Sequence, residues 1–128
     1  MREPDMDTLL FFDAHREALP LFEALEDKLF ARFPEAEKRV QKTQITYYHR
    51  HVFACVSFAR VKRKAELPER WLTLTLGLPY PLVSERAAVK TEAYPERWTT
   101  HLVLGSEGEL DEELMTWLDE AYAFSERK

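Results

Sequence analysis

The sequence predicts an α+β domain in which an antiparallel sheet of about five strands carries N- and C-terminal helices on one face. Apolar residues recur every three to four positions near both ends of the chain, which is typical of amphipathic helices. The stretch between them, at about residues 37–104, alternates apolar and polar side chains and favours strands. Short connections between the strand segments favour pairing of sequence neighbours as a meander.

The N-terminal third is predicted to be helical. A short helical segment at about residues 5–14 comes first, and a longer helix follows at about residues 17–33. Pro20 falls in the first turn of the longer helix, where the missing amide proton costs nothing, and Pro34 ends that helix. The apolar stripe of this helix is expected to pack on the sheet.

The C-terminal end is predicted to form one more helix, over residues 109–124. Ser106 and Glu109 have the spacing of a capping box, and acidic residues follow in the first helical turn. Together these elements make one domain over residues 1–128, with a core over residues 17–124.

Five segments are expected to be strands, at residues 45–49, 52–61, 71–78, 87–94 and 98–104. The cleanest alternation lies in residues 71–78. It sends four leucines to one face, which we expect to lie under the helices, and it sends Trp71, Thr73 and Thr75 to the other.

Composition narrows the functional classes. The net charge of −5 disfavours nucleic-acid binding, and no run of about 18 apolar residues is present that would span a membrane. Cys55 is the single cysteine, so no intrachain disulfide can form, which indicates a reducing compartment. We therefore expect a cytoplasmic protein without a signal peptide.

Several segments resemble a known family, the small bacterial domain called DUF5655. They are Val40-Gln41-Lys42-Thr43-Gln44-Ile45, Phe53-Ala54, Arg97-Trp98-Thr99-Thr100-His101, and Glu109-Leu110-Asp111-Glu112-Glu113-Leu114 with Trp117-Leu118 and Ala121-Tyr122. The resemblance covers residues 21–122 and implies the fold without implying a reaction. The family often has a second histidine where this chain has Thr100, which weakens any role that needs a histidine pair. The order helix, sheet, helix is also similar, more distantly, to frataxin-type iron chaperones.

The candidate ligand-binding surface is the helix-free face of the sheet. Trp71, Thr73 and Thr75 are expected there with His101, and Phe53 and Cys55 are further candidates. Such a mixture of aromatic, hydroxyl and imidazole groups is typical of small-molecule sites and partner interfaces, although a partly exposed sheet face explains it equally well.

Lys42 and Tyr47 complete the candidate ligand-binding set. Lys42 lies in the family-like segment, where a functional role would be that of a desolvated amine or of an anion ligand. The favoured interpretation is a lysine at a strand edge with its amine in water.

Three other clusters have simpler explanations than a functional site. His49 and His51 would need His101 or a carboxylate to hold a metal ion, but they lie in a predicted turn and nothing in the sequence brings His101 near them, so no metal site is predicted. The basic residues 60–64 read as a solubilising loop. The first long helix carries four acidic residues on its outer side, Glu17, Glu23, Glu26 and Asp27. In a frataxin-like protein these acids would form an iron-binding ridge, but the interleaved lysine and arginine favour an ordinary solvated face.

The sequence therefore predicts a non-enzymatic binding domain that uses the helix-free face for a small-molecule ligand or for a homodimer. The alternative is a small enzyme or a metal- or iron-handling protein of frataxin-like build, which would use His101, Lys42 and nearby carboxylates. No cofactor, nucleic-acid partner or membrane partner is expected.

Overall fold

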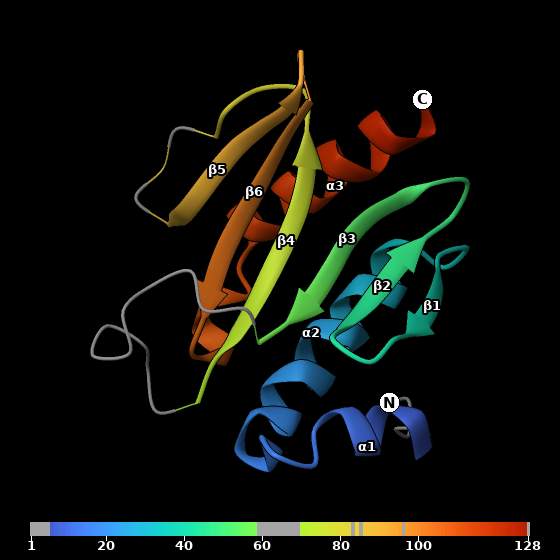
Figure 1. Cartoon of the computed structure of the whole chain (residues 1–128), viewed down its shortest axis with the longest axis vertical. Coiled ribbons are helices and arrows are strands. Elements are labelled where there is room, and N and C mark those ends of the chain that lie inside the picture. Colours follow the sequence, from blue (N-terminus) through green and yellow to red (C-terminus); the bar gives the residue numbers. More distant parts are fainter. Residues whose placement is uncertain (1–5, 59–69, 83, 85, 96, 128) are drawn as a thin grey trace.

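A computed structural model describes residues 6–58, 70–82, 84, 86–95 and 97–127 of the chain (Figure 1). Helical segments at both ends of the chain flank one antiparallel sheet, as predicted. They are α1 (Met6–Phe11), η1 (Arg16–Ala18), α2 (Leu19–Arg32), η3 (Glu107–Glu109) and α3 (Glu112–Glu126). None of the helices in these residues is long and apolar enough to cross a membrane.

The sheet has six strands in the order β1-β2-β3-β4-β6-β5, all antiparallel. Their bounds are β1 (Glu37–Val40), β2 (Gln44–Tyr48), β3 (Val52–Ser57), β4 (Leu72–Leu78), β5 (Ala87–Tyr94) and β6 (Arg97–Leu104). Strand β1 is the one that the sequence analysis missed. It is short and mostly charged, so it carries no apolar alternation that would reveal a strand.

The predicted meander is wrong at one point, because β4 pairs with β6 and not with β5. The connection from β4 to β5 contains Pro79 and Pro81, which cannot donate to a sheet ladder. It leads the chain to the outer edge of the sheet, and β6 then returns in the gap between β5 and β4 (Figure 1).

The leucines of β4 lie on the helix-covered face, as predicted. Leu72, Leu74, Leu76 and Leu78 have at most 1% of their surface exposed and belong to one core with the buried residues of α2 and α3. Opposite them, Thr75 and Gly77 are only half-buried. Alternation along β4 thus separates a leucine face from a face of small side chains.

Phe53 lies on the covered face, contrary to expectation. A register shift in the β2–β3 pairing leaves this residue without a partner between Val52 and Ala54, and such a bulge interrupts strict alternation. Its ring packs at 5.4 Å from the ring of Phe33 and at 5.0 Å from that of Tyr122.

Helix α3 begins three residues later than predicted. The capping box of Ser106 and Glu109 is present, but it closes the short η3 segment. The N-cap of α3 is Asp111, whose carboxylate accepts a hydrogen bond of 3.0 Å from the Leu114 amide. This bond lowers the pKa of Asp111, and Arg86 lowers it further.

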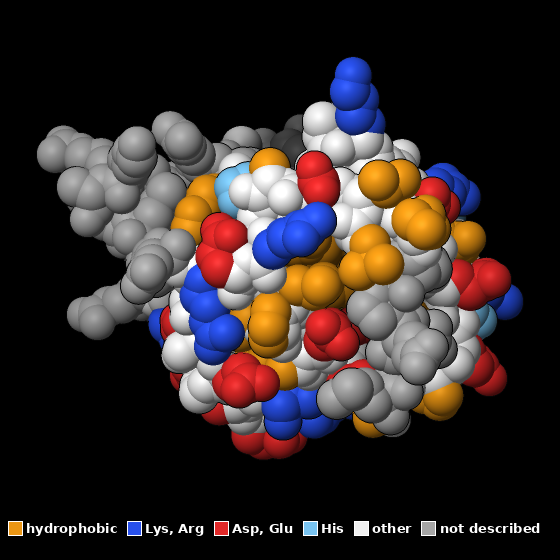
Figure 2. Space-filling view, turned by 90° about the horizontal axis from the view of Figure 1, so that it is seen from below, with side chains coloured by type: hydrophobic (Ala, Val, Ile, Leu, Met, Phe, Trp, Pro, Cys, Tyr) orange, Lys and Arg blue, Asp and Glu red, His pale blue; other side chains and the backbone are white. Residues whose placement is uncertain are grey.

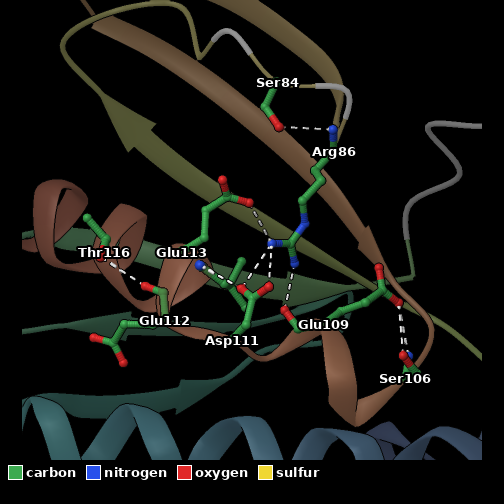
Figure 3. A network of polar contacts seen from close by, with 9 residues as sticks. Ser84, Arg86, Ser106, Glu109, Asp111, Glu112, Glu113 and Thr116 are labelled. Atoms are coloured by element: carbon green, nitrogen blue, oxygen red, sulfur yellow. Dashed lines mark hydrogen bonds and ion pairs between the residues drawn. The ribbon is translucent and has the colours of Figure 1, made fainter.

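Arg86 ties the β4–β5 connection to the start of α3 (Figure 3). Its guanidinium lies 3.0 Å from a carboxylate oxygen of Asp111 and 3.0 Å from one of Glu113, and it donates to the Glu109 carbonyl at 2.6 Å. It also lies 5.3 Å from the centre of the Trp117 ring. These partners all lie in η3 or in and just before α3. Arg86 therefore fixes the β4–β5 connection against the helix.

Candidate functional site

A row of three polar side chains crosses the centre of the helix-free face. Cys55 of β3, Thr75 of β4 and His101 of β6 are direct partners in the antiparallel register. The Thr75 Oγ1 atom lies 2.8 Å from Nδ1 of His101, and the hydroxyl also hydrogen-bonds the Cys55 thiol. The row therefore forms one hydrogen-bonded chain over three strands.

The groups of this row are uncharged at neutral pH. Burial raises the pKa of the Cys55 thiol, and the hydrogen bond from Thr75 offsets only part of that rise. Burial likewise lowers the pKa of His101. The row accordingly presents a thiol, a hydroxyl and a neutral imidazole, which are hydrogen-bonding groups without charge.

A shallow hollow of about 220 Å³ lies beside the row. Its lining comes from the ends of β3, β4 and β6, namely Val52, Phe53, Ala54, Cys55, Thr75, Leu76, Gly77 and Thr99. A Cβ atom placed on Gly77 would meet no other atom within 4 Å. The missing side chain at Gly77 thus leaves open space directly beside Thr75.

Thr73 occupies the predicted face but has no exposed surface. It pairs with Ser57 and Val103, and Ser57 is also buried. Thr73 and Ser57 are consequently closed to solvent, whereas Thr75 and His101 are partly exposed.

Trp71 lies away from the row. It precedes Thr75 by four residues, which places it about 13 Å along the strand. Its ring makes edge-on contacts with Phe58 at 5.6 Å and with His15 at 6.3 Å. The structure therefore puts Trp71 in an aromatic cluster at the end of the sheet, apart from His101.

Tyr47 lies on the covered face, in a buried polar cluster that the sequence analysis missed. Its hydroxyl donates to Glu26 Oε2 at 2.8 Å. Lys38 pairs with the same carboxylate at 3.2 Å and donates to the Thr8 hydroxyl at 3.0 Å. The cluster joins α1, α2, β1 and β2.

The placement of Glu26 on an outer acidic ridge is therefore wrong, because the residue is 5% exposed. The position of Glu26 in the sequence already indicates that it is buried. Glu26 follows Phe22 by four positions and precedes Leu29 by three, which puts it on the apolar stripe of α2.

Lys42 and the two histidines of the sequence analysis lie elsewhere. Lys42 is exposed between β1 and β2, at the end of the sheet near α1. His49 lies in the β2–β3 turn, where its Nδ1 contacts the Glu126 carboxylate and its Nε2 lies 3.6 Å from Glu35. His51 is exposed in the same turn.

The structure thus brings Thr75 and His101 together with Cys55 and separates them from Lys42, Tyr47 and Trp71. Among the described residues, no group of three histidine, cysteine or acidic side chains is arranged to hold a metal ion. The basic segment at residues 60–64 lies outside the described residues.

Comparison with known proteins places the chain in a family. No curated protein and no solved structure matches it. A family model described as a domain of unknown function, DUF5655, matches residues 10–125, which span all six strands, η1, α2, η3 and nearly all of α3. The chain therefore belongs to the DUF5655 family.

Proposed function

We propose that this domain is a binding module that takes a small uncharged ligand on the helix-free face of its sheet. The observation that supports the proposal is the hydrogen-bonded row of Cys55, Thr75 and His101 beside the hollow at Gly77. A concave surface with a few convergent polar groups is the common form of a small-molecule site. The free Cys55 thiol agrees with a role in a reducing compartment, such as the cytoplasm.

The electrostatics of the row favour binding over thiol catalysis. A nucleophilic cysteine needs a lowered pKa, whereas burial raises that of Cys55. The backbones of His101 and Cys55 lie two strands, about 10 Å, apart, and the Thr75 hydroxyl lies between the imidazole and the thiol. The imidazole therefore contacts Thr75 and not the thiol, and the alternative of a small enzyme has less support.

The shape of the hollow indicates the kind of ligand. Its volume of about 220 Å³ lies below the range of roughly 300–1,000 Å³ common for drug-sized ligands. The small side chains of Thr75, Gly77 and Thr99 allow a flat molecule to approach the backbone closely. A heteroaromatic ring that hydrogen-bonds Thr75 or His101 fits these features, and so does one side chain of a second copy of the chain.

The proposal can be tested with two glycine substitutions. Gly77→Ile fills the hollow, and Gly108→Ile adds the same side chain in η3, where a Cβ meets only the Ser106 hydroxyl at 3.8 Å. Amide NMR spectra of each protein would be recorded with neutral heteroaromatic fragments such as indole, quinoline and nicotinamide. Light scattering on the same samples reports self-association.

We expect fragments to shift the amides of Thr75, Gly77 and His101 in the wild type and in Gly108→Ile, and not in Gly77→Ile. A dimer that only Gly77→Ile dissociates would assign the face to self-association. Equal responses in all three proteins would contradict a binding role for this face.

A further inference from the structure

We infer a second binding site, for an organic anion with an aromatic body, in a groove between α1 and the β1–β2 turn. Two hollows of about 450 Å³ and 320 Å³ adjoin there and share Phe11 and Lys42 in their linings. The larger is completed by Thr43, Gln44, Ser57 and Phe58, and the smaller by Asp7, Leu10, Val40 and Gln41.

One wall of the larger hollow is aromatic and held in place. The rings of Phe11 and Phe58 stack at 5.7 Å with 25° between their planes, and both are half-buried. Phe58 is held further by stacking on His15 at 3.8 Å and by edge-on contacts with Phe12 at 5.4 Å and Trp71 at 5.6 Å. A ring laid against this wall would gain aromatic contact without ordering the protein first.

The lining of the larger hollow also includes a cation. Lys42 is exposed and makes no ion pair with any residue that the structure describes. Its turn is closed by a bond of 2.8 Å from the Gln41 amide to the Gln44 carbonyl, and the Gln41 side chain accepts from Thr46 at 2.8 Å. The protein as a whole has a net charge of −5, so this lysine is a local site of attraction for anions. A lysine beside an apolar wall favours a ligand that carries both an anionic group and a ring.

The charges along the groove also orient the ligand. Asp7 lines the smaller hollow together with Lys42 and would repel a second anionic group there. The site therefore suits a monoanion, such as an aromatic carboxylate or sulfonate, with its head at Lys42 and its rings on Phe11 and Phe58.

The surface next to the groove is apolar as well. Met6, Leu9 and Leu10 of α1 are 68%, 43% and 64% exposed. In Figure 2, which views the molecule from below, hydrophobic side chains gather at the surface with charged ones around them. A ligand with an extended apolar body would find further contact along α1.

The test uses 8-anilinonaphthalene-1-sulfonate as the probe and N-phenyl-1-naphthylamine, which has the same rings without the sulfonate, as the uncharged control. Binding would be measured by fluorescence titration at low and high salt. The variants are Lys42→Glu and, as a matched charge reversal on α2, Lys28→Glu, which is exposed and lies outside both hollows.

We expect saturable binding of the sulfonate that Lys42→Glu weakens about fivefold or more, an effect that high salt reduces. Lys28→Glu should change it less than about twofold, and binding of the uncharged control should respond to neither variant. Gly77→Ile should leave sulfonate binding intact, which separates this site from the sheet face. Equal loss in the two lysine variants, or no loss in either, would overturn the assignment.

Discussion

The two faces of the sheet carry different kinds of side chain. The covered face carries leucines that are fully buried under the helices, whereas the free face carries threonines, a cysteine and a glycine. The first arrangement stabilises the fold through apolar burial, and the second leaves hydrogen-bonding groups and open space at the centre of the sheet. Strand β4 contributes alternate residues to both faces, so one strand serves the core and the proposed binding surface.

The largest expected effect concerns the buried polar cluster on the covered side. Glu26→Ala would leave Lys38 charged and nearly buried, and removing one partner of such a pair costs about 3–5 kcal/mol of unfolding free energy. Glu23→Ala, a half-buried acid on the same helix, is the control. Urea unfolding measures both. A loss below about 1 kcal/mol in Glu26→Ala would show that the ion pair adds no net stability.

Adjacent positions on β4 compare the two faces directly. Leu74→Ala should lower the unfolding free energy by about 2–5 kcal/mol, because it opens a cavity in a packed core. Thr75→Val keeps the side-chain volume and should cost less than about 1 kcal/mol, since His101 is partly exposed and gains water in place of the hydroxyl. Similar losses at both positions would mean that the free face is also core.

Thr100 is a polar residue on the covered face, and its removal should be favourable. Its hydroxyl is buried and has no hydrogen-bond partner among the described residues. Thr100→Val should therefore raise the unfolding free energy by about 1 kcal/mol, read from the urea midpoint. A decrease would show that a buried water satisfies the hydroxyl.

The smallest effect is a pH dependence at the far end of α3. The contact with His49 lowers the pKa of Glu126 below its usual 4.5. A carboxylate with a lowered folded-state pKa adds stability above the unfolded-state value, and that stability is lost as the pH falls through the folded-state value. Glu126→Gln should therefore flatten the acid limb of the stability profile below pH 4.5.

The exposed Glu107→Gln serves as the control for this profile. Thermal unfolding between pH 7 and about pH 3 would give the curves. An unchanged acid limb in Glu126→Gln would mean that the His49 contact does not form in solution.

The sequence predicted the structure correctly where a single period of apolar and polar residues dominates a segment. The alternation of Leu72, Leu74 and Leu76 with Thr73 and Thr75 predicted both faces, because each residue type prefers one environment. It failed at Phe53, since a bulge breaks the alternation without any local signature.

The candidate site was predictable only in part. Thr75 and His101 were assigned to the same face, but their contact depends on β6 pairing with β4, which no local pattern determines. Trp71 follows the alternation of β4 in sequence, yet it lies in the aromatic cluster at the end of the strand. Long-range pairing decides which of these side chains meet.

The strand order also has a consequence for synthesis on the ribosome. Strand β4 cannot complete its ladder until β6 has emerged, because β5, which is made first, ends up at the outer edge. At ordinary translation rates this leaves the edge of β4 unpaired for on the order of a second or more. During that interval the nascent chain presents a leucine-rich strand to its surroundings, which is when aggregation and chaperone capture compete with folding.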